Sequence, residues 1–234
     1  MNKWVLQNHC LIPDVPFSSA EKISQEKASE LMAMKNAILV RSIYNFDIKE
    51  PKEGWFIIKE SFGGIDELSA STKSKTRRGL KKCIVKLTNT YTKDEKQTDI
   101  WEVFLKENEE KIGYSINRIA ENEVFYETFR ISKKYLKGNY PYYALIYSMN
   151  EYYLSKKDYK FVCDGFRTMR ERSDIQKFLI DKFKFRKAYC NTMIYYNSSL
   201  SKMAKYLYAI RFFFPGERAK AFFRQHRLFS NSKD

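Results

Sequence analysis

Hydrophobic and polar positions along the chain follow two periods, a period of two that is typical of strands and a period near 3.6 that is typical of helices. Short apolar or β-branched runs predict strands at residues 37–44, 55–59, 124–129, 159–163 and 188–196. The first two are close enough in sequence to pair as a hairpin. Apolar residues at helical spacing predict helices at residues 21–36, 99–111, 141–154 and 174–183. Residues 1–20 contain Pro13 and Pro16 and are expected to be irregular.

Strands that alternate with helices predict an α/β (α+β) fold, in which a mixed central sheet is flanked by helices. Two helix starts carry capping signals, because Pro141 suits the first position of a helix and Ser173 with Gln176 forms a capping box. No repeat or low-complexity linker marks a boundary. We therefore expect a lead-in with a helix at 1–36, one domain at 37–197 and a helical tail at 198–234.

The composition is that of a folded protein. Of the 234 residues, 44% are hydrophobic and 16% are aromatic, which is enough to build a core and excludes wholesale disorder. No stretch approaches the ~20 apolar residues that span a membrane, and the N-terminus lacks the apolar segment of a signal peptide. The 4 cysteines are far apart and only 2 histidines occur, a pattern that disfavours a zinc site or a disulfide framework. We expect a cytoplasmic protein with reduced thiols and no metal.

The charge balance narrows the class of partner. The chain has 43 Lys and Arg against 28 Asp and Glu, a net charge of +15. Such an excess favours an anionic partner, which is nucleic acid, a phosphorylated cofactor or an anionic lipid. The excess is concentrated at residues 69–90, which contain 7 Lys or Arg and no acid. Apolar residues recur there at helical spacing and predict a helix with one apolar stripe and one basic face: Leu80, Cys83, Ile84 and Leu87. The alternative for the end of this segment is a strand at residues 84–88.

This basic helix is the first candidate site. Two pairs of like charges are four residues apart and lie on one face, at a cost of about a few tenths of a kcal/mol each: Arg77 with Lys81, and Arg78 with Lys82. A bound anion would remove the repulsion. The residues that we expect to bind an anionic donor or acceptor are Lys75, Arg77, Arg78 and Lys81. The alternative is a solvated surface helix.

Two further positions are candidates for binding a substrate. Asp164 and Arg167 are predicted to lie in a loop that leaves a buried strand, and α/β sheets hold ligands at the carboxyl ends of parallel strands. Arg186 lies in a basic run just before the last strand. The alternative for both positions is ordinary turn chemistry on a solvated edge. His9 and His226 lie near the termini without a positioned partner and are not expected to be catalytic.

Two segments carry a resemblance to a known family. The run LSASTKSKTRRGLKKC (residues 68–83) is similar to a helix of the Fem-type aminoacyltransferases, which are relatives of the GNAT acyltransferases. Residues 142–196 look like the second half of a GNAT-like domain, with a helix, a strand, a capped helix, a turn reading FKFRKAY and a final strand. The resemblance covers residues 37–197. It implies a GNAT-like sheet in which two central parallel strands splay apart, here 124–129 and 159–163, so that donor and acceptor meet between them.

The resemblance also implies roles for individual residues. Many family members have a glutamate on the first splayed strand as general base, and Glu127 occupies that position among aromatic neighbours. The alternative is a glutamate at the edge of an amphipathic strand. Other members use a tyrosine as the acid toward the leaving group, a role that would fall to Tyr189 or Tyr195.

One departure from the family pattern concerns the acyl donor. Family members that use coenzyme A have an R/Q-x-x-G-x-G/A loop, whose backbone amides bind the pyrophosphate. Residues 133–141 occupy that place and contain one glycine, Gly138, followed by Pro141. Fem-type enzymes lack the loop and take their acyl group from charged tRNA, which the net positive charge would suit. Acyl-CoA and aminoacyl-tRNA therefore both remain open as donors.

The tail offers a different partner. Residues 201–229 contain 7 Lys or Arg, one acid and interleaved aromatic residues, and they predict a helix interrupted at Pro215. Such a segment either lies peripherally on an anionic membrane or packs its aromatic residues against the domain. Membrane contact at the inner face would suit an acceptor carried on lipid, such as a cell-envelope or polysaccharide precursor.

Two functions follow from these observations. The first is an acyltransferase that transfers an acyl or aminoacyl group to an amine acceptor. The second is a non-catalytic GNAT-like module that binds RNA or anionic lipid. The fold alone does not decide between them.

Overall fold

The described part of the chain is distributed over two compact units. In this computed structural model it comprises residues 4–7, 10–13, 16–52, 54–93, 96–168, 174–197, 206 and 211–213. The first unit contains residues 1–55, 168–170 and 189–234, and the second contains residues 56–167 and 171–188. The segment 37–197 therefore contributes residues to both units.

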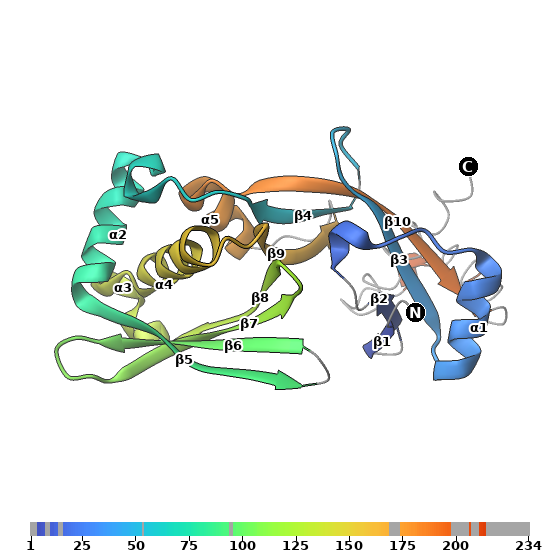
Figure 1. Ribbon diagram of the computed structural model, residues 1–234, viewed down its shortest axis with the longest axis horizontal. Helices are drawn as coiled ribbons and strands as arrows, with labels where there is room; N and C mark the ends of the chain where they lie inside the picture. Colours follow the sequence, from blue (N-terminus) through green and yellow to red (C-terminus); the bar gives the residue numbers. More distant parts are fainter. Residues whose placement is uncertain are drawn as a thin grey trace. The chain divides into compact units, whose positions relative to one another are not determined.

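The second unit is built on a mixed sheet, with strands in the order β4-β9-β8-β7-β6-β5 (Figure 1). Their bounds are β4 Gly54–Lys59, β5 Cys83–Lys93, β6 Lys96–Leu105, β7 Lys111–Ala120, β8 Glu123–Ile131 and β9 Phe161–Thr168. Strands β5 to β8 form an antiparallel meander, whereas β8 and β9 are parallel. The mixed sheet expected from the sequence is confirmed.

Helices α2 and α4 pack together over one face of the meander (Figure 1). The helices of this unit are α2 Ala70–Lys82, α3 Leu136–Asn139, α4 Pro141–Glu151 and α5 Asp174–Phe183. Short turns of 3-10 helix occur at Gly64–Glu67 and Lys133–Tyr135, and α4 continues into a π-helical turn at Tyr152–Lys156. Helix α5 meets α4 through Phe178, whose ring centroid is 5.0 Å from that of Tyr143.

The helix predicted at residues 99–111 is wrong, because this segment forms β6 and the turn after it. Trp101, Val103 and Leu105 are buried and alternate with the partly exposed Glu102 and Phe104. That period of two is the strand pattern, and pairing with β5 on one side and β7 on the other stabilises it. Strand β7 was not predicted at all.

Polar side chains of β6 and β7 are buried and joined to a tyrosine of the π-helical turn. The hydroxyl of Tyr153 donates to Oδ2 of Asp99 at 2.8 Å. It also accepts from Nε1 of Trp101 at 2.7 Å and from Nδ2 of Asn117 at 3.2 Å. All four residues are at most 4% exposed. Burial raises the pKa of Tyr153, so its phenol remains protonated and able to donate.

Small residues let α2 approach the start of α4. The buried face of α2 consists of Thr72, Thr76 and Gly79. A Cβ atom on Gly79 would lie 2.6 Å from the backbone oxygen of Tyr140 and 3.2 Å from the backbone nitrogen of Ala144. A glycine is therefore needed for this close contact between the two helices.

The basic helix is confirmed, but the stripe expected on it is divided between two elements. Helix α2 begins at the N-cap Ser69, whose side chain accepts from the backbone N–H of Thr72, and it ends at Lys82. Cys83 and Leu87 lie on β5, which agrees with the alternative of a strand at residues 84–88. The pairing of Cys83 with Leu105 of β6 ends the helix there, because those backbone groups are used by the sheet.

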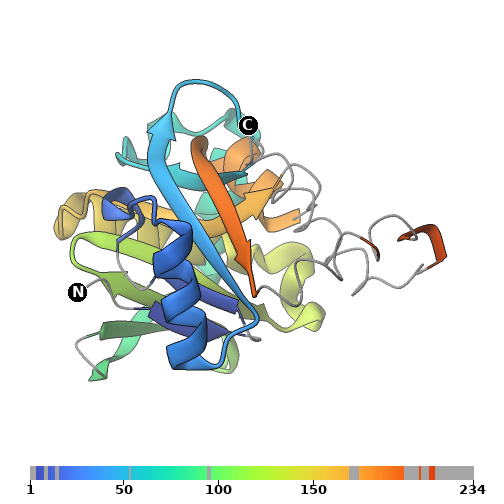
Figure 2. The same ribbon diagram turned by 90° about the vertical axis from the view of Figure 1, so that its right-hand side faces the viewer.

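The first unit contains a second set of strands in the order β1-β2-β3-β10. Its elements are β1 Trp4–Gln7, β2 Cys10–Pro13, a 3-10 turn at Phe17–Ser19, α1 Gln25–Lys35, β3 Leu39–Ile48, β10 Arg186–Tyr196 and a 3-10 turn at Arg211–Phe213. Figure 2 shows β3 beside β10, with α1 against β3. The core between them contains Leu11, Ala28, Leu31, Met32, Val40 and Tyr195.

Two expectations about this unit are wrong. The lead-in is not wholly irregular, because β1 and β2 pair antiparallel and β2 pairs parallel with β3. The hairpin between residues 37–44 and 55–59 does not form either, since β3 takes β10 as its antiparallel partner. The hairpin was expected because the two segments are adjacent in the sequence. Strand β10 is a longer partner for β3 than the segment 55–59 would be.

The predicted tail helix at residues 203–229 lies almost entirely outside the described residues, of which only Tyr206 and Arg211–Phe213 fall in this range. Ser173, the expected cap of α5, also lies outside them. Within the described residues, no helix combines the length and apolar character needed to cross a membrane.

Candidate functional site

Strands β8 and β9 run parallel for three pairs and then separate. The register joins Glu123 to Phe161 at one end and Phe125 to Cys163 at the other. Both strands continue beyond that point, β8 to Ile131 and β9 to Thr168. No further residues of these two described strands are paired with each other. The two parallel central strands expected from the sequence are confirmed, and their pairing ends as the resemblance implied.

Tyr126 is the first residue of β8 beyond the last pair with β9. It is buried, and its hydroxyl donates to Oδ1 of Asn150 on α4 at 2.8 Å. Burial raises the pKa of Tyr126 well above its ordinary value, with a smaller contribution from Tyr153. Its ring packs against those of Phe129 and Phe185, with centroids 5.7 and 6.4 Å away. The Nδ2 group of Asn150 has no hydrogen-bond acceptor among the described residues, which leaves a buried donor beside Tyr126.

Glu127 lies at a β-bulge. The pairing of β8 with β7 passes from Tyr126 directly to Thr128, so that Glu127 has no opposite residue. Its carboxylate accepts from Nε of Arg118 at 2.8 Å, and its side chain is 46% exposed. The guanidinium of Arg118 in turn lies 4.4 Å from the ring centroid of Phe125. Glu127 is therefore an accessible, ion-paired carboxylate, not one enclosed by the aromatic side chains that flank it in the sequence.

The loop predicted around Asp164 and Arg167 is wrong, because both residues belong to β9. Gly165 has a φ of 59°, which a glycine adopts without strain, and the strand continues through it. Asp164 is 5% exposed, and its backbone oxygen accepts from Nε2 of Gln176 at 3.1 Å. Gln176 thus ties α5 to β9. The side chain of Arg167 lies outside the described part of the chain.

Arg186 and Tyr189 lie on β10, where each has a partner. Nε and Nη2 of Arg186 donate to Oε2 of Glu60 at 2.9 and 2.7 Å, so an acid already balances this charge. The ring of Tyr189 meets Trp55 edge-on with centroids 6.3 Å apart.

The four candidate cations of α2 fall into two groups. Arg78 and Lys81 line a cavity, together with Lys82. Lys75 and Arg77 are not among its lining residues. Nζ of Lys75 lies 5.7 Å from the ring centroid of Tyr143, and Arg77 is exposed. The structure therefore separates residues that the sequence grouped together.

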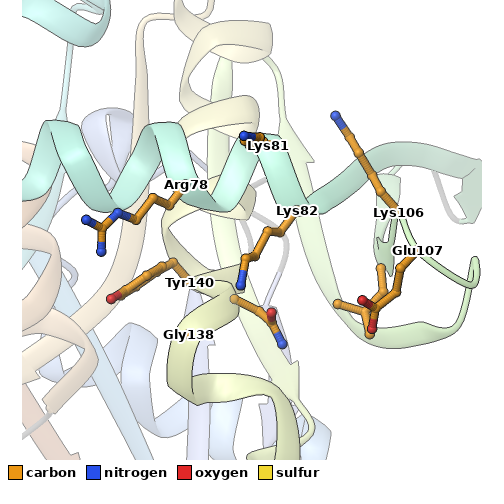
Figure 3. Close-up of a pocket in the computed structure, with 9 residues that line it drawn as sticks. Arg78, Lys81, Lys82, Lys106, Glu107, Gly138 and Tyr140 are labelled. Carbon is orange, nitrogen blue, oxygen red and sulfur yellow. The ribbon is translucent and has the colours of Figure 1, made fainter.

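The cavity has a volume of about 730 Å³ and is formed by three segments. They are the last two turns of α2, the end of β6 with the two residues after it, and residues 138–140 before α4. The lining residues are Arg78, Lys81, Lys82, Leu105, Lys106, Glu107, Gly138, Asn139 and Tyr140. In Figure 3, Arg78 and Lys82 extend toward the 138–140 segment, whereas Lys81 and Lys106 extend away from it. Four cations and one acid give the cavity a positive potential.

Comparison with solved structures identifies the fold. The crystal structure of FemX superposes with a TM-score of 0.50 at 12% sequence identity, covering 76% of this chain and 78% of the FemX chain. The chain has a GNAT-like, Fem-type fold. At this level of identity the likeness concerns the fold and not the chemistry.

Two other solved structures match with lower scores. A functionally unknown conserved protein from Staphylococcus epidermidis ATCC 12228 matches with a TM-score of 0.41 at 6% identity, over 80% of this chain and 84% of that one. A tandem GNAT protein from the clavulanic acid biosynthesis pathway matches with a TM-score of 0.42 at 9% identity, over 79% and 74% of the two chains. Neither a protein-family model nor a curated protein sequence matches the chain.

Three residues of the cavity were missed as candidates: Lys82, Lys106 and Tyr140. Lys82 was visible as the partner of Arg78 at i,i+4 spacing, and this spacing could have identified it. The other two gave no such signal. Lys106 follows a strand that was predicted to be a helix, and Tyr140 reaches the cavity only through the turn that precedes α4.

Proposed function

We propose that the protein is an acyltransferase that forms an amide between an acyl group and an amine where β8 and β9 separate. The observation that carries this proposal is the end of parallel pairing at Phe125 and Cys163 in a sheet of GNAT-like order. Strands that separate leave backbone N–H and C=O groups without a partner strand, and a ligand can bind them. The buried donor of Asn150 beside Tyr126 supports a ligand at the same point.

The reaction would begin with attack of the amine nitrogen on the acyl carbonyl carbon. A C–N bond forms while the bond from that carbon to the leaving sulfur or oxygen breaks. The amine loses one proton, and the leaving group gains one. Glu127 would accept the amine proton, directly or through a water molecule, and its exposure makes this possible. Arg118 would hold the carboxylate in one orientation.

The acyl donor would be acyl-CoA or aminoacyl-tRNA, both of which carry phosphates. The first turn of α4 has few free backbone amides, because Pro141 has no N–H and the amides of Tyr143 and Ala144 donate to the Tyr140 oxygen. Side-chain cations would therefore bind the donor phosphates. The candidates remain Lys75, Arg77, Arg78 and Lys81 on α2, with Asp164, Arg167 and Arg186 as further substrate contacts. A lipid-carried cell-envelope or polysaccharide precursor remains a candidate acceptor.

The test compares two glutamates in similar surroundings. Purified protein is incubated with acetyl-CoA or with a mixture of aminoacyl-tRNAs, together with a panel of primary amines, and amide products are identified by mass spectrometry. Glu127→Gln should lower kcat by ~100-fold to 10,000-fold, the usual effect of removing a general base. Glu102→Gln is the matched control, because Glu102 also pairs with a cation on β7, Lys111. Absence of product with both donors, or an equal loss in the two variants, would refute the proposal.

The tyrosine that the resemblance names as acid has its own test. Tyr189→Phe should lower the rate most for donors with a poor leaving group, because a proton on the leaving atom matters most there. Tyr195→Phe is the comparison, since the sequence did not separate the two tyrosines. Equal rates in the wild type and Tyr189→Phe would remove Tyr189 from the reaction.

The second candidate function is binding of RNA without catalysis. Arg78, Lys81 and Lys82 form no ion pair among the residues described, which also suits a phosphodiester backbone bound without chemistry. In that case log K for an RNA oligonucleotide would fall linearly with log salt, and no amide would form from any donor. A linear fall accompanied by amide formation would instead indicate tRNA as the donor.

A further inference from the structure

The meander of strands β5 to β8 has two chemically different faces. Helices α2 and α4 lie on one side of it, which we call the inner face (Figure 1). The inner face contains Asp99, Trp101 and Asn117, which are joined to Tyr153 of the turn that continues α4. Because side chains alternate along a strand, the residues between them belong to the opposite, outer face. Within the described residues of the second unit, no helix lies on that side of the meander.

The outer face carries aromatic rings that are open to solvent. An antiparallel sheet that faces water on one side normally presents polar side chains there. Here Tyr91 is 45% exposed, and Phe104 and Tyr114 are partly exposed. Phe104 and Tyr114 lie on adjacent strands, one residue pair apart along the ladder, since Tyr114 is opposite Glu102. The outer face therefore offers flat apolar surfaces beside one another.

Cations flank these rings. The register places Lys86 of β5 opposite Glu102 of β6, Glu102 opposite Tyr114 of β7, and Tyr114 opposite Arg130 of β8. Neighbouring strands are about 4.8 Å apart, so the backbones of the two terminal cations of this row are about 14 Å apart, with a ring between them. Nζ of Lys86 also lies 5.8 Å from the ring centroid of Phe104.

The positive charge of the outer face is only partly balanced. Glu102 pairs with Lys111, and the carboxylate at the bulge of β8 pairs with the arginine opposite it. Lys86 and Arg130 are exposed and form no ion pair among the described residues. The face therefore keeps a positive charge that an anionic partner would neutralise.

The combination of rings and cations favours one kind of anionic partner. A nucleic-acid duplex keeps its bases inside, so it would use the cations and leave the rings in water. A single strand offers an anionic backbone together with unstacked bases, which aromatic side chains bind by stacking. A second copy of the chain would bring the same positive surface against itself, which is unfavourable.

We propose that the outer face of β5 to β8 binds single-stranded nucleic acid. Bases would stack on Phe104 and Tyr114, and backbone phosphates would be bound by Lys86 and Arg130. Every base has a flat π-face, so such a surface accepts many sequences. None of these four residues lines the cavity at α2, so this surface is separate from the phosphate contacts assigned above. The inference does not rest on acyl transfer.

Binding is measured by fluorescence anisotropy with a labelled single-stranded uridine dodecamer. The same strand annealed to an adenosine dodecamer serves as the duplex probe. The single strand should bind about 10-fold or more tightly than the duplex, because only its bases are free to stack. Its log K should fall linearly with log salt, because bound phosphates release counterions.

The role of the cations is tested through this salt dependence. Lys86→Ala and Arg130→Ala should each reduce the slope of log K against log salt by about 0.7, the value for one phosphate contact on a single strand. Lys157→Ala is the matched control, because Nζ of Lys157 also lies beside an aromatic ring, 5.6 Å from the centroid of Tyr152, on the turn after α4. It should leave the slope unchanged.

The role of the rings is tested at constant salt. Phe104→Leu and Tyr114→Leu should each weaken binding of the single strand about 5-fold or more, with little effect on the duplex and no change in the salt slope. Phe104→Tyr keeps a ring and should bind as the wild type does. A lower melting temperature with equal losses for single strand and duplex would show that the rings act only in folding, and would overturn their role in stacking.

Three results would overturn the surface itself. One is unchanged RNA binding in Lys86→Ala and Phe104→Leu with a loss in Arg78→Ala, which would assign the RNA to α2. Another is equal affinity for single strand and duplex in the wild type. The third is binding to phosphatidylserine vesicles without binding of the single strand, which would indicate an anionic lipid surface. No measurement requires amide formation, and Glu127 and Arg118 are kept in every variant, so failure of the acyltransferase proposal would leave these results readable.

Discussion

Removing one hydroxyl from Tyr153 should destabilise the second unit strongly. Tyr153→Phe keeps the ring and its edge contact with Trp101, whose centroid is 5.9 Å away. It removes the donor to Asp99 and the acceptor for both Trp101 and Asn117. All these groups are buried, so water cannot replace the lost hydroxyl.

The remaining partners determine the size of the effect. Oδ1 of Asp99 still accepts from Thr90 at 2.8 Å, and Nδ2 of Asn117 is still 3.1 Å from Sδ of Met149. Nε1 of Trp101 has no other acceptor among the described residues and is left unsatisfied, which costs about 1–3 kcal/mol. Loss of a hydrogen bond to a carboxylate adds to this. We expect a total of about 2–4 kcal/mol, or a melting temperature lower by roughly 5–15 °C in a chain of this size.

Tyr152→Phe is the matched control. Tyr152 is adjacent, only half-buried, and its ring also meets Trp101 edge-on at 5.2 Å. No side-chain hydrogen bond of its hydroxyl is recorded among the described residues, so its loss should change stability by less than about 0.5 kcal/mol. Urea denaturation followed by circular dichroism and by Trp fluorescence measures both variants.

A double-mutant cycle with Trp101→Phe tests the cause. If Trp101 loses its acceptor in Tyr153→Phe, the double variant should be less destabilised than the sum of the two single variants. Equal stability of Tyr153→Phe and Tyr152→Phe would refute the reasoning, because a buried hydroxyl with three partners would then contribute no more than a peripheral one.

Three further predictions concern glycines, pH and thiols. Gly79→Ala should cost about 1–3 kcal/mol because its Cβ would collide with the Tyr140 backbone at 2.6 Å. Gly63→Ala is the control, because its Cβ would meet only side-chain atoms of Glu67, at 3.2 Å or more. Equal melting temperatures of the two variants would contradict the close contact. The free energy of unfolding should fall as the pH rises above about 9. Burial raises the pKa of Cys190 from 9.0 to about 12 and that of Cys163 well above 9.0, so the unfolded chain releases protons that the folded chain keeps. A free energy of unfolding that stays constant from pH 8 to 10.5 in urea titrations would exclude this. The four cysteines are buried and should react with a maleimide at pH 8 far more slowly than in urea, and rapid labelling of the native protein would show that their burial is incomplete.

The fold class was predictable where one period dominates a segment. The helix that begins at Pro141 and the strand at 188–196 have clean patterns and appear with nearly the expected bounds. Strand β7 has no such pattern, because its core face includes Ser115 and Asn117, whose buried polar groups are satisfied by each other, Met149 and Tyr153. Hydrogen-bond partners that are more than 30 residues away in the sequence cannot be predicted from the residues of the strand itself.

The candidate site was predictable only at the level of charge. The sequence showed a basic helix, but whether a cation lines the cavity depends on what the neighbouring elements place beside it. Arg77 and Arg78 are adjacent and chemically identical, and only the approach of residues 138–140 distinguishes them. In the same way, the bulge that leaves Glu127 without an opposite residue depends on the register of two strands, which no single strand encodes.

The partner of β3 is synthesised late. Strands β5 to β8 can pair one after another as the ribosome extends the chain, since each follows its neighbour directly. The antiparallel partner of β3, in contrast, is translated roughly 150 residues later, which at ~5–20 residues per second leaves one edge of β3 open for on the order of ten seconds or more. During that interval a nascent chain exposes hydrogen-bonding groups that another chain can capture. The first unit should therefore be the part of the protein that most depends on chaperones and on slow expression for correct assembly.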